Sequence, residues 1–215
     1  MSKTQGLYPD TFYHIYNRGN NRENIFVEER NYRYLLERYT HYIEPVAATY
    51  AYCLLRNHFH FLVRIRSEEE QEVIWKRGRQ TNQTCGVSET PQVFVARVPS
   101  GQFSNLFNTY AKAINKAYGR TGSLFEGRFK RRPVKGQEDL IQLVRYIHRN
   151  PERHGFVDDY REWPYSSYQA LVSERPTRTQ RDEVLDWFQG RRAFEDAHIL
   201  EDETAIEDLV LDDYF

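Results

Sequence analysis

Hydrophobic and polar residues alternate through residues 57–65, NHFHFLVRI, as they do in a β-strand with one buried face. Successive strand side chains point to opposite faces, so the apolar residues at positions 59, 61, 63 and 65 share one face. His58 and His60 share the other face with Arg64. The face that carries the histidines is therefore not expected to form the main core.

Other segments of the chain show the period of a strand or of a helix. Strands are predicted at residues 11–19, 47–56 and 129–134. Apolar residues at helical spacing predict helices over 28–43, 103–118 and 138–150. Gly119 is expected to end the second of these helices and Pro151 the third.

The rest of the chain completes the predicted architecture. Residues 67–98 form a long connection that contains a short helix or a loop, and helical candidates follow at 180–189 and 191–199. Strands that alternate with helices in this way predict an α+β fold, with the helices on one face of an antiparallel sheet.

The composition agrees with one folded domain that has a substantial core. The chain has 215 residues, of which 40% are hydrophobic. No apolar run reaches the roughly 18 residues that a membrane span needs, and the N-terminal residues lack the apolar core of a secretion signal. Cys53 and Cys85 do not form a metal-binding type of pair. We therefore expect a cytoplasmic protein without a membrane partner.

Charge is distributed unevenly along the chain. The net charge is −1, but residues 171–215 carry 5 arginines and 13 acidic residues, which gives −8 there and +7 elsewhere. A basic body suggests a polyanionic partner such as nucleic acid, although scattered surface charge gives the same balance. The acidic tail has three interpretations: it docks on the basic surface, it contacts another protein, or it only aids solubility.

Basic residues gather in the stretch 116–135, KAYGRTGSLFEGRFKRRPVK, against a single acid, Glu126. Aromatic residues are interleaved with them, and basic groups neutralise phosphates while aromatic faces stack on unpaired bases. The pattern favours contact with single-stranded nucleic acid; a solvated loop with buried aromatics is the alternative. The turn NRGNNREN near residue 20 adds two arginines. The predicted DNA-binding residues are Arg18, Arg22, Arg120, Arg128, Lys130, Arg131 and Arg132.

The histidine pair and one tyrosine are the candidates for chemistry. Neutral imidazoles at the spacing of His58 and His60 can bind one divalent metal ion, but two partly exposed histidines without a ligand fit as well. Tyr110 can act as a covalent nucleophile with help from a metal or a base. It lies in the apolar stripe of its own helix, so a core tyrosine is the simpler interpretation. Tyr118 has the same two interpretations.

Five segments occur in the order and spacing of a known family: YHIYNRGNNRENIF (13–26), NHFHFLVRI (57–65), YAKAINKAYGRTGSLFEGRFK (110–130), YIHRNP (146–151) and WPYSSY (163–168). Together they resemble the single-tyrosine transposases of the His-hydrophobic-His superfamily, in particular the REP-associated tyrosine transposases. The resemblance covers residues 8–172 as one catalytic domain, and residues 173–215 form an acidic helical extension.

This resemblance implies a ferredoxin-like antiparallel sheet with helices on one face, a homodimer, and metal-dependent cleavage of single-stranded DNA next to a hairpin. It implies that His58 and His60 bind Mg²⁺ or Mn²⁺ and that Tyr110 attacks the phosphorus. The product is then a 5′-phosphotyrosine with a free 3′-OH, which can be rejoined without a nucleotide cofactor.

The sequence departs from the family pattern at one position. Several relatives have a polar metal ligand one helical turn after the tyrosine, where this chain has Ile114. Asn115 is the nearest polar candidate for the third ligand, but on a straight helix it points about 140° away from Tyr110 and shares a face with Tyr118. The departure supports a second hypothesis, a DNA-hairpin-binding regulator that no longer cuts. A third is a small metal-dependent hydrolase, against which the basic stretch argues.

Overall fold

The structure is a computed structural model that describes residues 6–82 and 94–199, without the side chains of 78–82. Cys85 and the acidic residues beyond 199 lie outside this part of the chain. Its first elements are β1 (Phe12–Arg18), a 3-10 turn (Asn20–Arg22), α1 (Glu29–Tyr42), β2 (Ala47–Leu54), β3 (His58–Ile65) and α2 (Glu68–Asn82). The later ones are α3 (Pro99–Ala117), β4 (Lys130–Val134), α4 (Gln137–Arg153), a 3-10 turn (Tyr160–Glu162), α5 (Tyr168–Val172), α6 (Arg181–Trp187) and α7 (Arg191–Ile199).

The four strands form one sheet in the order β2-β3-β1-β4, and each pair of neighbours is antiparallel. Together with α1 and α3, this is the ferredoxin-like order that the resemblance implies. The predicted α+β fold with an antiparallel sheet is confirmed. The predicted helices in the C-terminal part are also present, as α6 and α7.

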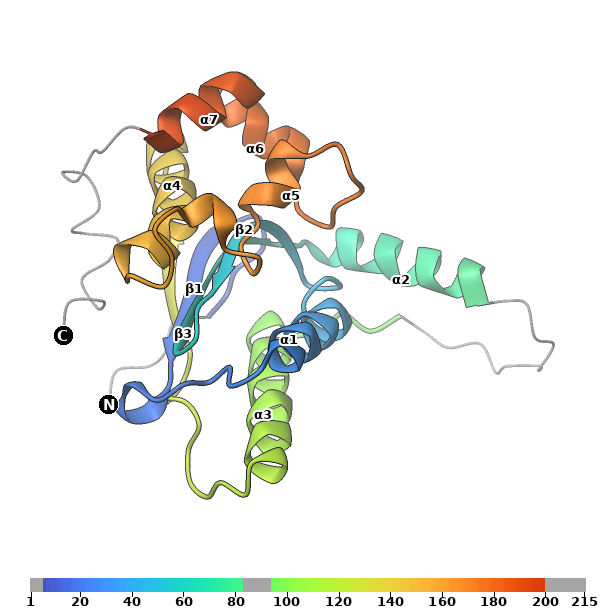
Figure 1. Cartoon of the computed structure of the whole chain (residues 1–215). Coiled ribbons are helices and arrows are strands. Elements are labelled where there is room, and N and C mark those ends of the chain that lie inside the picture. Colours follow the sequence, from blue (N-terminus) through green and yellow to red (C-terminus); the bar gives the residue numbers. More distant parts are fainter. Residues whose placement is uncertain (1–5, 83–93, 200–215) are drawn as a thin grey trace.

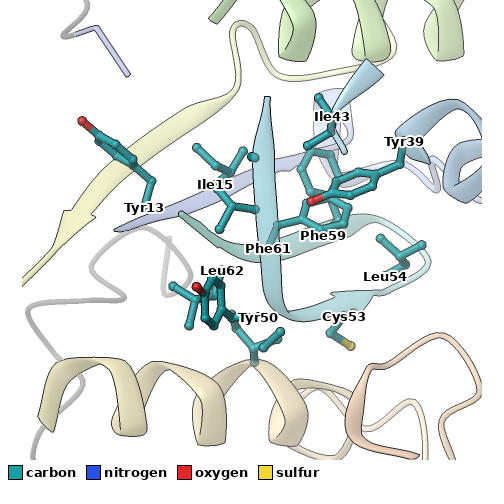
Figure 2. Packing of buried hydrophobic residues seen from close by; sticks show 14 of the residues in the cluster. Tyr13, Ile15, Tyr39, Ile43, Tyr50, Cys53, Leu54, Phe59, Phe61 and Leu62 are labelled. Atoms are coloured by element: carbon teal, nitrogen blue, oxygen red, sulfur yellow. The ribbon is translucent and has the colours of Figure 1, made fainter. Parts of the chain in front are cut away.

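The first face of the sheet holds the aromatic core that the alternating pattern predicts. The ring of Phe59 stacks on Phe107 of α3 at 4.9 Å between centroids, and Phe61 stacks on Tyr39 of α1 at 4.7 Å. Phe59 and Phe61 point to the side of Tyr39, and α1 and α3 lie together on that side of the sheet (Figures 1 and 2). We call this the α3 face.

The second face carries the histidines, and α4 covers it (Figure 1). Leu62 lies on this side in Figure 2, opposite Phe59 and Phe61. The even-numbered residues of β1 pair with the even-numbered residues of β3, for example Tyr16 with His60, so their side chains share this face. We call it the α4 face; contrary to the sequence-based expectation, it is part of the buried interior.

Pro151 does not end α4, which continues to Arg153. A proline near the end of a helix removes only one backbone donor, and the backbone N–H of His154 closes the last turn on the carbonyl of Asn150 at 3.0 Å.

After the helix, the chain returns to the sheet, where the Trp163 indole donates to the carbonyl of Leu54 at 2.9 Å. None of the helices in residues 6–82 and 94–199 has the length and apolar character of a membrane span.

Candidate functional site

His58 and His60 lie on the α4 face of β3, with side chains that are 8% and 1% exposed. Register places β1 beside them, and Nε2 of His14 lies 2.9 Å from Nδ1 of His60. The amide oxygen of Asn57 accepts a hydrogen bond from Nδ1 of His58 at 2.7 Å. Each histidine is therefore held through its Nδ1 atom, which is how the orientation of a metal-binding imidazole is usually fixed.

The protonation state of these histidines follows from their burial. Burial, followed by the nearby His154, lowers the pKa of His58 to about 3. Burial and then the neighbouring His14 lower the pKa of His60 well below its usual value. Both imidazoles are thus neutral at pH 7, and Nε2 of His58 has no hydrogen-bond partner in the described part of the chain. If His60 donates from Nδ1 to His14, its own Nε2 also keeps a lone pair.

Helix α4 places a tyrosine directly beside the histidines. The ring of Tyr146 meets the ring of His60 edge-on, with 5.4 Å between centroids. Its hydroxyl group is buried and forms no hydrogen bond with any described residue. The guanidinium carbon of Arg153 lies 5.6 Å from the centre of the Tyr146 ring. The hydroxyl group of Tyr146 therefore has no hydrogen-bond partner among the described residues, and its ring lies close to a cation.

Asn150 lies one helical turn after Tyr146 and is fully buried. Its Nδ2 donates to the carbonyl of Tyr146 at 3.0 Å, whereas its Oδ1 has no hydrogen-bond partner among the described residues. A buried oxygen without a donor is costly unless a ligand satisfies it. Relative to Tyr146, Asn150 has the spacing at which the resemblance implies a polar third ligand.

These atoms fit a divalent metal ion. No cluster of three or more His, Cys, Asp or Glu side chains suited to a metal occurs in the described residues, so a site at His58 and His60 would need a third protein ligand of another kind. Two imidazoles and the amide oxygen of Asn150 meet this condition. Mn²⁺ accepts imidazole more readily than Mg²⁺, which prefers oxygen ligands.

The structure does not bring Tyr110 to the histidines, which corrects the expectation for this residue. Tyr110 lies in α3 on the opposite face of the sheet, with its side chain completely buried. Its hydroxyl donates to the carbonyl of Ile25 at 2.7 Å, and its ring packs near Phe26 and Phe125. Tyr110 has the surroundings of a core tyrosine.

Asn115 and Tyr118 also lie away from the histidines, on the α3 side. The side chain of Asn115 donates to the carbonyl of Gly122 at 2.9 Å, which holds the turn after α3. The hydroxyl of Tyr118 donates to Glu28 at 2.9 Å, at the start of α1. Neither residue is placed to complete a metal site with His58 and His60.

A small depression opens beside the histidines, and basic residues border it. It is lined by Tyr16, Asn17, Arg18, His58, His60, Glu126 and Lys130. Arg18 is paired with Glu126, and the ammonium group of Lys130 lies 5.8 Å from the centre of the Tyr16 ring. The predicted basic stretch thus reaches the histidine site through its strand β4.

The other predicted DNA-binding residues are spread over both faces. Arg132 pairs in register with His14 and lies on the α4 face, whereas Arg131 donates to Ser100 of α3 at 2.8 Å on the other face. Arg120 is bound to Glu23 at 2.6 Å. Arg22 lies in the turn after β1 with a φ of 59°, and Arg128 lies in the loop before β4.

Sequence reasoning missed Tyr146, Asn150 and His14. The signal for the first two was present in YIHRNP, which has a tyrosine and an asparagine four residues apart on a predicted helix. His14 stands in the first strand, but only the pairing of β1 with β3 shows that it reaches His60.

Comparisons with known proteins bear on the fold and on the resemblance. No family model matches the chain. A curated REP-associated tyrosine transposase of Haemophilus influenzae is 25% identical over 124 residues, which is 58% of this chain and 60% of the relative. The alignment therefore spans less than two thirds of that relative. A solved structure of a REP-associated tyrosine transposase bound to a REP hairpin has a TM-score of 0.55 and 15% identity, and covers 82% of this chain and 88% of that one. The likeness shows a shared fold and, with the curated relative, confirms the resemblance to these transposases.

Proposed function

We propose that this chain is a metal-dependent endonuclease and strand transferase that cuts single-stranded DNA near a hairpin. The observation that carries the proposal is the meeting of His58, His60 and Tyr146 on one face of the sheet. The names of the two similar proteins, a REP-associated tyrosine transposase and one bound to a REP hairpin, support the kind of reaction and the kind of substrate.

His58, His60 and Asn150 would hold Mg²⁺ or Mn²⁺. Such an ion polarises the scissile phosphate and stabilises the negative charge that builds up in the transition state. The surrounding residues keep this site ready to bind: Asn57 orients His58, and His14 orients His60. Burial keeps these imidazoles neutral, as metal ligation requires.

Tyr146 would be the nucleophile. Its phenol oxygen forms a bond to the phosphorus, the bond from phosphorus to the 3′ oxygen breaks, and the phenolic proton passes to that 3′ oxygen. The product is a 5′-phosphotyrosine and a free 3′-OH, which can later attack the phosphotyrosine and restore the DNA strand. Arg153, close to the ring of Tyr146, favours the developing phenolate by its charge.

The substrate would approach through the depression at Lys130 and Arg18. Its basic border suits a DNA backbone, and the phosphate to be cut would lie beside the two histidines. The family resemblance also supports a homodimer as the assembled form.

One observation favours a second candidate, a hairpin-binding protein that does not cut. Tyr146 is 2% exposed, and Asn150 is not exposed at all. A phosphate reaches them only if α4 or the rim of the depression moves. A chain that kept the basic surface but not this motion would bind DNA without cleaving it.

The test is a denaturing gel of the protein with a labelled library of DNA hairpins that carry single-stranded flanks, with Mn²⁺ or with EDTA. We expect a covalent protein–DNA adduct with Mn²⁺ only, and its loss in His58→Ala and His60→Ala. His41→Ala, on the side of α1, is the matched control and keeps the adduct.

Two results would contradict the proposal. Absence of an adduct across the library, together with a retained shift on a native gel, would favour the binding protein. Turnover of p-nitrophenyl phosphate without any effect on DNA would favour the small hydrolase.

A further inference from the structure

A second cavity lies on the α3 face, away from the histidines. Its volume is about 510 Å³, within the range of about 300–1,000 Å³ that is usual for small-ligand sites. It is lined by Gly6, Asn17, Ser100, Gly101, Ser104, Phe107, Asn108, Phe125, Gly127, Arg128, Phe129 and Arg131. We call it the α3 pocket; the activity proposed above makes no use of it.

The charge of the α3 pocket is suited to an anion. Arg128 and Arg131 both line it, and none of its described lining residues has a carboxylate. Burial is the main cause that lowers the pKa of Arg131; Tyr13 acts in the opposite direction, and the like charge of Arg128 lowers the pKa further. The two cations thus repel each other across the pocket, and a bound phosphate would relieve that repulsion.

The remaining lining is suited to a nucleobase. The guanidinium carbon of Arg131 lies 4.2 Å from the centre of the Phe129 ring, so that cation and aromatic ring together form one wall. Phe107 and Phe125 also line the pocket, although each is only 5–6% exposed, so Phe129 with Arg131 forms its main aromatic wall. Asn108 is exposed on α3 and has both a donor and an acceptor with which to read a base edge. Aromatic surface for stacking and a nearby cation are the features that hold unpaired nucleotides.

The α3 pocket and the histidine depression are adjacent. Asn17 lines both, and its side chain donates to the carbonyl of Gly127 at 3.2 Å. Glu126 and Lys130 line the depression, while the residues between them line the α3 pocket. The segment 126–130 is therefore a ridge, with the histidines on one side and the pocket on the other.

We propose that the α3 pocket binds one unpaired nucleotide of the DNA strand that crosses this ridge, with Arg128 on its phosphate and Asn108 on its base. The inference rests on the proposed function, because that function supplies the single strand and the phosphate beside the histidines. On this proposal, α3 contributes to the selectivity for the DNA sequence next to the cut.

The experiment measures binding in EDTA, so that cleavage does not contribute. The probe is a pool of DNA hairpins with a short randomised unpaired flank, and the bound fraction is sequenced. Asn108→Ala is compared with Asn105→Ala, an exposed asparagine of the same helix that does not line the pocket. Arg128→Ala is compared with Arg192→Ala, whose side chain is 96% exposed on α7.

We expect the wild-type protein to select a base at one flank position, and Asn108→Ala to lose that preference while Asn105→Ala keeps it. Arg128→Ala should bind about tenfold more weakly whatever the flank, because a charge-assisted contact to phosphate is lost. Arg192→Ala should bind like the wild type. Filling the pocket with Ser104→Tyr should also remove the base preference.

The inference is overturned if Asn108→Ala selects the same flank as the wild type, or if no flank base is selected at all. A parallel cleavage assay with Mn²⁺ separates the two proposals. Cleavage without base selection overturns the α3 pocket alone, and base selection without cleavage overturns the catalytic proposal alone.

Discussion

Two tyrosines of this chain differ in what surrounds their hydroxyl groups. The hydroxyl of Tyr110 donates to the carbonyl of Ile25, and burial raises the pKa of Tyr110 far above its usual value. The hydroxyl of Tyr146 forms no hydrogen bond with a described residue, and the ring of Tyr146 lies beside that of His60. A buried phenol with a good acceptor stabilises the fold, whereas one without a partner next to possible metal ligands is suited to chemistry.

At the residue scale, Tyr110→Phe should lower the free energy of unfolding by about 1–3 kcal/mol, because the carbonyl of Ile25 loses its buried donor. Urea unfolding measures this change. Tyr118→Phe, which removes a more exposed hydroxyl bonded to Glu28, should have a smaller effect. Adduct formation by the folded Tyr110→Phe protein should equal that of the wild type. A stable Tyr110→Phe protein that forms no adduct would instead support Tyr110 as the nucleophile.

At the scale of elements, two faces of α4 pack against the rest of the protein. One face directs Tyr146 and Asn150 to the sheet, and the other buries His148 against the C-terminal helices. Nδ1 of His148 lies 2.9 Å from Nε2 of His198 in α7, and its Nε2 lies 2.8 Å from the hydroxyl of Ser167. The C-terminal part of the chain thus holds the helix of the proposed nucleophile through contacts on its His148 side.

The burial of His198 makes the stability of the fold sensitive to acid. Burial, with the charges of Arg145 and Arg149, lowers the pKa of His198 to about 4. The unfolded chain therefore binds a proton below about pH 6.5 that the folded chain does not bind until about pH 4. Between these values, His198 should lower the free energy of unfolding by about 1.4 kcal/mol for each unit by which the pH falls. Denaturant unfolding at a series of pH values gives the slope of the free energy of unfolding against pH. This slope should be smaller by that amount in His198→Gln, and an unchanged slope would contradict the role of His198.

The elements themselves could largely be predicted from the sequence, and the site only in part. Alternation and helical spacing are local properties, so the strand of His58 and His60 was identified with its two faces. Which helix covers a face depends on the packing of distant segments. Tyr110 and Tyr146 both occur in predicted helices, and only the placement of α3 and α4 on opposite faces distinguishes them. The period of α4 likewise did not show that it continues through Pro151.

At the scale of the whole molecule, the sheet separates the two proposed sites. The α4 face carries the residues proposed to bind the metal and to act as nucleophile, and the α3 face carries the pocket proposed to bind a neighbouring nucleotide. The basic residues of β4 and the loop before it serve both, because adjacent strand residues such as Arg131 and Arg132 point to opposite faces. A single DNA strand across this edge would therefore meet positive charge on either side.

This arrangement predicts a strong dependence of DNA binding on salt. A plot of log affinity against log salt concentration should have a slope whose magnitude decreases by about one in Arg132→Ala, as expected when one phosphate contact is lost. Arg33→Ala, which removes an exposed arginine bound to Glu29 on α1, should leave the slope as it is. Equal slopes in the wild type and Arg132→Ala would show that the β4 edge does not contact the backbone.

The central claim is that Tyr146, beside His58 and His60, forms the covalent link to DNA. The most direct measurement is to trap the adduct on a labelled hairpin with Mn²⁺, digest it with a protease, and identify the modified residue by mass spectrometry. We predict that the DNA is attached to the peptide that contains Tyr146 and that Tyr146→Phe forms no adduct. An adduct on Tyr110, Tyr118 or Tyr16 would contradict the account.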